Sequence, residues 1–140
     1  RKSYWGEHSF PLILQNGHRY MLFLSLFVLA ILWYDAWTAF WFADAAGVEH
    51  FGIGVGTIVL TANCTLLSAY LLGCHSLRHL VGGCVDQLSK APLGVACYSC
   101  VSGLNGRHMM WAWFSLFSVG FSDLYVRLCS MGVWTDVRIL

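Results

Sequence analysis

Apolar residues run along this chain in three long stretches that more polar segments separate. The first covers about residues 20–42, the second about 51–73 and the third about 108–126. A helix crosses the hydrocarbon of a bilayer with about 20 mainly apolar residues, because it rises about 1.5 Å per residue. The pattern therefore predicts an all-α protein, a transmembrane helical bundle in which three spans are visible.

Aromatic and glycine residues refine two of these spans. The outer part of the first span carries Trp33, Tyr34, Trp37 and Trp41, which is typical of the aromatic belt at a membrane interface. The second span begins with Gly52 and Gly56, a pair of small residues four positions apart that would let another helix approach closely.

Residues 81–107 contain the helix-breaking residues Gly82, Gly83, Pro92 and Gly94, so a long irregular connection is expected there. The chain begins at Arg1 without a methionine, and we expect further sequence before it.

Composition and charge agree with a membrane protein and exclude two other classes. Apolar residues make up 58% of the chain and charged residues 11%. The net charge of +1 excludes a nucleic-acid partner, which would require clustered Lys and Arg. The six cysteines do not indicate a secreted disulfide scaffold, because such a domain would be polar and rich in loops.

The distribution of Lys and Arg predicts the orientation in the membrane. Three of these residues precede the first span and three lie between the second and third, namely Arg1, Lys2, Arg19, Arg78, Lys90 and Arg107. The loop 43–50 has none. Cationic flanks stay on the cytoplasmic side, so we expect a multi-pass protein of the inner (cell) membrane with its carboxyl terminus outside.

Cysteines and histidines gather at the predicted cytoplasmic end. The segment LLGCHSLRHLVGGC, residues 71–84, contains Cys74, His75, His79 and Cys84 where the second span emerges. His75 and His79 are four residues apart and would share one helix face. Further candidates at the same end are His18, Cys97, Cys100 and His108. Several costly polar side chains at one helix end indicate a cofactor, although His18 alone could equally contact lipid headgroups.

Ligand chemistry leaves three cofactors open. Two thiolates and two imidazoles suit a Rieske-type [2Fe–2S] cluster, which we rank first. Two imidazoles from different helices suit haem b, which we rank second. Structural zinc also accepts such ligands and ranks third, because it supplies no redox function.

Three segments resemble the membrane anchor of actinobacterial-type succinate dehydrogenase, respiratory complex II. They are CHSLRHLVGG at 74–83, SGLNGRHMMWAWFSL at 102–116 and SDLYVRLCSMGVWTD at 122–136. The resemblance implies an anchor for a flavoprotein subunit and an iron–sulfur subunit, which passes electrons from succinate to menaquinone or ubiquinone. Relatives have five spans, so residues 1–140 would form a single membrane-anchor domain, the C-terminal part of a longer subunit.

The resemblance also implies a membrane-embedded Rieske-type cluster. Cys74, His75, His79 and His108 match the family's motif positions. Leu77 stands where some relatives have a cysteine, so the second thiolate would come from the remaining cysteines of that end, Cys84, Cys97 or Cys100.

Quinone needs an apolar slot with a proton donor. Asp35 and Asp123 are charged residues within spans, and Arg127 could pair with Asp123. Trp111 and Ser115 lie nearer the predicted relay centre and are rival contacts. A haem-binding cytochrome anchor of another oxidoreductase and a purely structural anchor remain alternatives.

Overall fold

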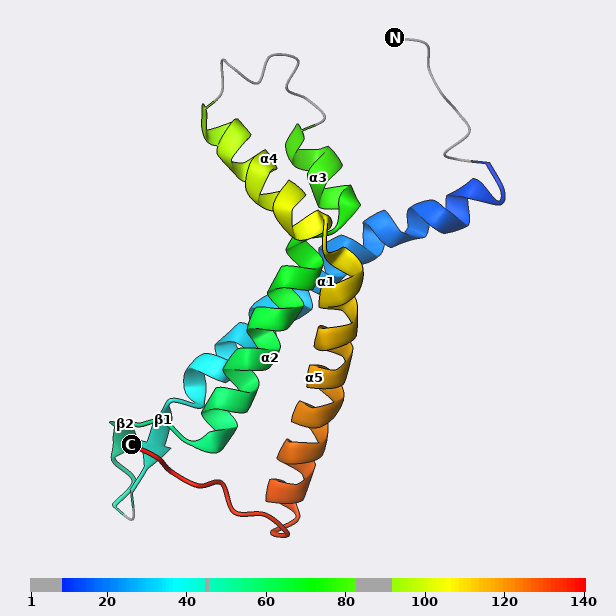
Figure 1. The fold of residues 1–140 in the computed structure, drawn as a ribbon. Helices are drawn as coiled ribbons and strands as arrows, with labels where there is room; N and C mark the ends of the chain where they lie inside the picture. Colours follow the sequence, from blue (N-terminus) through cyan, green and yellow to red (C-terminus); the bar gives the residue numbers. More distant parts are fainter. Residues whose placement is uncertain (1–8, 45, 83–91) are drawn as a thin grey trace.

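The computed structural model describes residues 9–44, 46–82 and 92–140 and is mostly helical (Figure 1). Its elements in chain order are α1 (Leu12–Thr38), β1 (Trp41–Ala43), β2 (Glu49–Phe51), α2 (Val55–Leu72), α3 (His75–Gly82), α4 (Pro92–Asn105) and α5 (His108–Ser130). The predicted all-α class is confirmed, with a short antiparallel hairpin as the only sheet among the described residues.

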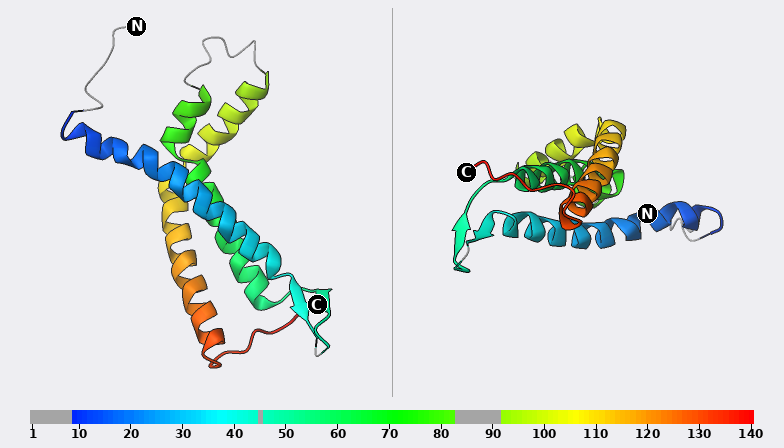
Figure 2. Two further views of the ribbon diagram at one scale, coloured as in Figure 1. Left: turned by 180° about the vertical axis from the view of Figure 1, so that it is seen from behind. Right: turned by 90° about the horizontal axis from the view of Figure 1, so that it is seen from below.

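Helix α2 is the centre of the bundle. Helix α5 packs beside it, and α1 crosses it on another side (Figures 1 and 2). Seen from below, α1 lies in one layer while α2 and α5 lie in the other (Figure 2). Helices α3 and α4 form a hairpin beyond one end of α2, and the β-hairpin lies at the opposite end. The bundle therefore has two ends of different construction.

The helices match the three predicted spans with shifted boundaries. Among the described helices, α1 and α2 are long and apolar enough to cross a membrane, judged by length and composition, whereas α5 lies at the third predicted span but is less apolar. Helix α1 starts at Leu12 rather than near residue 20 and ends at Thr38, because Trp41 and Phe42 pair with the strand at 49–51. Helix α2 covers 55–72, and α5 continues to Ser130.

The prediction of an irregular connection over 81–107 is wrong, because α4 occupies much of it. Pro92 is the first residue of α4, where a missing N–H costs no intrahelical hydrogen bond. Gly82 is the last residue of α3, and a Cβ there would lie 2.7 Å from the ring of Tyr98. The Arg78 guanidinium joins the two helices, donating to the Ser102 hydroxyl at 3.0 Å and to the Tyr98 hydroxyl at 2.6 Å.

The interior of the bundle contains many small and polar residues beside a few large ones such as Leu22, Leu29 and Tyr125, whereas many large apolar residues lie outside. Buried positions include Thr57, Asn63, Cys64, Ser115 and Ser122. Exposed positions carry phenylalanine, leucine, tryptophan and methionine along α1 and α5. In water this arrangement would be unfavourable, but lipid solvates the apolar side chains and small residues let helices approach closely. The packing thus agrees with a membrane bundle.

The small residues Gly52 and Gly56 contact the C-terminal tail, residues 131–140, and not another helix as predicted. The Gly56 amide donates to Asp136 Oδ1 at 2.8 Å, and a Cβ on Gly52 would lie 2.6 Å from the Leu140 carbonyl oxygen. The Tyr125 hydroxyl donates to the same Asp136 oxygen at 2.7 Å. The tail therefore joins the end of α5 to the start of α2.

The turn of the β-hairpin is organised by Asp44. Its Oδ1 accepts the amides of Ala46 and Val48 at 2.8 and 2.9 Å, and Gly47 adopts φ +79°. The backbone amide of Val48 and the imidazole of His50 lower the pKa of Asp44, because both stabilise the carboxylate.

Candidate metal centre

A break between α2 and α3 positions Cys74. Helix α2 ends at Leu72, and the amides of Gly73 and Cys74 donate to Ala69 and Leu71 carbonyls. His75 therefore begins a separate helix, α3, which carries both His75 and His79. The break turns the Cys74 side chain inward, where it is 2% exposed.

His18 of α1 completes a group of three possible ligands with Cys74 and His75. His18 Nε2 lies 3.2 Å from Cys74 Sγ, and the His18 and His75 rings stack with centroids 5.5 Å apart and planes 3° apart. One ligand atom from each of the three residues lies within 4.8 Å of the others. Two chain segments that are far apart in sequence thus bring two imidazoles and a thiol to one point.

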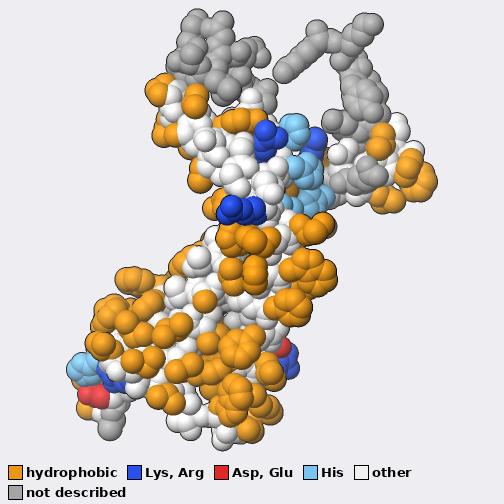
Figure 3. Space-filling model, in the orientation of Figure 1, with side chains coloured by type: hydrophobic (Ala, Val, Ile, Leu, Met, Phe, Trp, Pro, Cys, Tyr) orange, Lys and Arg blue, Asp and Glu red, His pale blue; other side chains and the backbone are white. Residues whose placement is uncertain are grey.

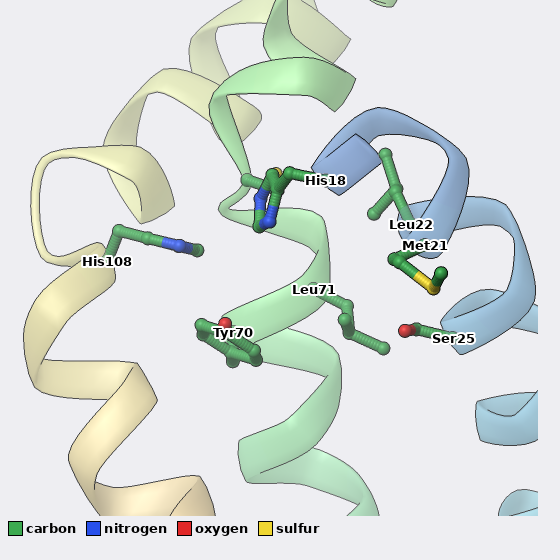
Figure 4. A pocket seen from close by; sticks show the side chains of 8 residues that line it. His18, Met21, Leu22, Ser25, Tyr70, Leu71 and His108 are labelled. Carbon is green, nitrogen blue, oxygen red and sulfur yellow. The ribbon is translucent and has the colours of Figure 1, made fainter. Parts of the chain in front are cut away.

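His79 and His108 lie beside this group. The His79 ring is 6.4 Å from that of His75, on the predicted shared face. His108 lines the same cavity of about 180 Å³ as His18 and Cys74, and its ring stacks on Tyr70 at 4.8 Å. Figure 4 shows His18 from α1 and His108 from α5 pointing toward this space. His108 Nδ1 is buried without a hydrogen-bond partner, which leaves a donor or acceptor available for a ligand.

The other cysteines are placed differently. Cys84 lies outside the described residues. Cys97 and Cys100 are exposed on α4 and are not part of the three-residue group. Cys64 is buried in α2, and its thiol donates to the Leu32 carbonyl at 3.3 Å, which is a packing role. The described residues therefore bring one cysteine, Cys74, to the group.

Local electrostatics favour the neutral form of His75. Burial lowers the pKa of His75, and the nearby His18, His79 and Arg19 add to the effect. A lowered pKa favours the neutral imidazole, which is the form that ligates a metal.

The structure separates the quinone candidates into two kinds. Asp123 and Arg127 form a helix-surface ion pair at 2.8 Å, with side chains 61% and 70% exposed, and Asp35 is also exposed. Ser115 is buried and donates to the Ala112 carbonyl. Trp111 differs from these residues because its Nε1 is a buried donor without a partner.

Trp111 also lines an open groove at the joint of α4 and α5. The groove has a volume of about 670 Å³, and its lining includes Arg107 and Ser102. Ligand sites commonly measure about 300–1,000 Å³, so the groove is large enough for a small ring compound.

Sequence reasoning missed the roles of Tyr70 and Asp136. Tyr70 precedes Cys74 by four residues, so helical spacing places it beneath the break, where it supports the His108 ring. Asp136 lies in a tail with no regular periodicity, so no sequence pattern connects it with Gly56.

Comparisons with known proteins identify the family of this chain. The family described as actinobacterial succinate dehydrogenase subunit SdhC matches residues 1–132. A chain of the solved Mycobacterium smegmatis Sdh1 complex in the apo form is 41% identical, with a TM-score of 0.82 over 100% of the present chain. The present chain covers 51% of that chain, about half of its length. The comparison with curated proteins gave no match.

Proposed function

Because the chain belongs to the family of actinobacterial succinate dehydrogenase SdhC subunits, we propose that it relays electrons from an iron–sulfur subunit to membrane quinone. The observation that carries the proposal is the group formed by His18, Cys74 and His75 at one end of the bundle. A soluble partner delivers electrons at the membrane surface, so a relay centre is expected near helix ends, and Cys74 and His75 lie where α2 ends and α3 begins.

The donor set fits a Rieske-type [2Fe–2S] cluster. Such a cluster has two imidazoles on one iron and two thiolates on the other, and it would carry one electron at a time. His18 and His75 would supply the imidazoles and Cys74 one thiolate. Cys84, Cys97 and Cys100 remain the candidates for the second thiolate. His79 and His108 flank the group and could replace or orient an imidazole.

Haem b fits the same residues less well. The His18 and His75 rings are stacked on each other at 5.5 Å, so they would leave no room for a macrocycle between them. The cavity beside them is about 180 Å³, below the usual size of a cofactor pocket. Zinc would accept the same donors but would carry no electrons.

Trp111 is the best supported quinone contact. Its buried Nε1–H lacks an acceptor, and a quinone carbonyl is an acceptor. Trp111 follows His108 by one helical turn, so quinone in this groove would lie close to the relay centre. Asp35, Asp123 and Arg127 lie toward the other end of the bundle, and Ser115 already donates to a backbone carbonyl. The groove therefore suits menaquinone or ubiquinone better than the Asp123–Arg127 pair does.

Charge distribution supports a cytoplasmic position for the centre. Arg19 lies in the early part of α1, Arg78 in α3 and Arg107 directly before α5, so all three lie near the centre, which is the arrangement of a cytoplasmic flank. The flavoprotein and iron–sulfur subunits of succinate dehydrogenase would dock on this side, and lipid would surround the spans.

The proposal is tested with His75→Ala in the assembled complex, with His50→Ala in the distant hairpin as control. We expect His75→Ala to remove a Rieske-like paramagnetic resonance signal from the reduced complex and to abolish quinone reduction. Succinate oxidation with a soluble dye should persist, because the flavin lies on another subunit. An unchanged signal and quinone reductase rate would refute the site.

A further inference from the structure

A second cavity lies between α1 and α3, on the side of the metal centre. It measures about 260 Å³ and is lined by Arg19, Ser76 and His79 together with Leu22, Phe23 and Leu80. Ser76 is only 7% exposed, and its hydroxyl has no hydrogen-bond partner. A buried hydroxyl without a partner is uncommon in native proteins and indicates a missing ligand or water.

The surroundings of this cavity favour an anion. Arg19 contributes a positive charge, and Ser76 lies in the first turn of α3, where backbone N–H groups lack intrahelical acceptors. Figure 3 shows Lys or Arg side chains gathered with His side chains in the upper half of the molecule, while the acidic side chains lie in the lower half beside further Lys, Arg and His side chains.

The remaining lining is apolar and faces outward. Phe23 and Leu80 are each 59% exposed, so an occupant of the cavity would continue along an apolar surface. A phospholipid has this combination of an anionic head and apolar chains, and Arg at a membrane surface attracts anionic lipid.

We propose that this cavity binds the phosphate of an anionic phospholipid, with an acyl chain lying along Phe23 and Leu80. Arg19 supplies the charge, and the Ser76 hydroxyl donates to a phosphate oxygen. The site lies beside the metal centre but does not depend on which cofactor that centre carries.

The test measures phosphatidylglycerol binding to the purified complex by native mass spectrometry, with phosphatidylcholine as the neutral comparison. We expect the complex to prefer phosphatidylglycerol. Arg19→Gln should weaken its binding about fivefold, because one cation near a membrane surface is worth about 1 kcal/mol. Ser76→Ala should also weaken it. Arg19→Lys and the distant control Arg138→Gln should bind as the unmodified complex does.

Several outcomes would overturn the proposal. Unchanged phosphatidylglycerol binding in Arg19→Gln would exclude this cavity as the site. Displacement of the lipid by inorganic phosphate alone would assign the cavity to free phosphate, and displacement by a short-chain quinone would assign it to quinone. Iron content measured in the same samples separates a failure of the lipid site from a failure of the proposed relay.

Discussion

At the end of the bundle where α3 and α4 emerge, side chains from three helices surround a cavity, whereas at the other end the C-terminal tail closes on α2. Near the cavity, His108 Nδ1 and the Ser76 hydroxyl are buried without partners. At the tail, one oxygen of Asp136 accepts hydrogen bonds from both Gly56 and Tyr125. Buried polar groups without partners can take a ligand where they lie beside a cavity, whereas the shared contacts of Asp136 hold the tail in place; Thr61, Asn63 and Ser122 also have buried polar atoms without partners.

The largest expected difference between the two regions concerns iron. Cys74→Ala should lower the iron content of this subunit at least about tenfold, because it removes a proposed ligand and not an outer contact. Cys64→Ala is the matched control, since Cys64 is equally buried but hydrogen-bonds a backbone carbonyl. Iron would be measured in the assembled complex. Equal iron content in Cys74→Ala and Cys64→Ala would contradict the proposal that Cys74 is a ligand.

The next effect concerns the tail. Asp136→Ala leaves the Gly56 amide and the Tyr125 hydroxyl without their acceptor, which should lower the free energy of unfolding by about 3 kcal/mol. Asp123→Ala removes an exposed ion pair and should cost less than about 1 kcal/mol. Unfolding in mild detergent, followed by tryptophan fluorescence, measures both. A larger loss in Asp123→Ala would show that the tail contributes little.

A glycine substitution tests the same contact from the side of α2. In Gly56→Ala the new Cβ would lie 3.0 Å from the Asp136 carboxylate, so the tail must shift at a cost of about 1 kcal/mol. Gly103 in α4 has no such neighbour within 4 Å, and Gly103→Ala should stabilise its helix by about 0.5–1 kcal/mol. The same unfolding measurement would show a lower free energy of unfolding for Gly56→Ala and a higher one for Gly103→Ala. A change in the same direction for both variants would contradict the close approach of the tail.

The smallest effect is a pH dependence of the β-hairpin. Because the folded pKa of Asp44 is lowered, its carboxylate stabilises the turn above the unfolded pKa of 3.8. This contribution is lost as the pH falls from that value through the lower, folded pKa. Hydrogen exchange of the Ala46 and Val48 amides, corrected for the intrinsic effect of pH, should show the turn opening. Asp44→Asn does not titrate and should remove this dependence.

The spans were predictable from sequence because a helix that crosses lipid needs a long stretch of mainly apolar residues. Their boundaries were less predictable, since the ends depend on tertiary contacts. Helix α1 stops where Trp41 pairs with Phe51, and that pairing depends on a turn rather than on hydropathy. Helix α4 was missed because Pro92 and Gly94 were interpreted as breakers, although a proline can begin a helix.

The candidate site was predicted in composition but not in geometry. Sequence placed Cys74 and His75 together because they are adjacent, and it placed His79 on the same face from helical spacing. The contact between His18 and Cys74 joins residues 56 positions apart, so no local period reveals it. Likewise, the small residue Gly56 predicted that another segment packs closely against it, but the sequence did not indicate that this segment is the C-terminal tail.

The contact between His18 and Cys74 has a consequence for how this chain can change in length. Ala36, near the other end of α1, is 1% exposed and fixes that end in its packing. An insertion or deletion of one residue between Ala36 and His18 would rotate the imidazole about the helix axis by about 100° and shift it by about 1.5 Å. His18 would then point away from Cys74. Over evolution this stretch of α1 can therefore accept substitutions but not insertions or deletions.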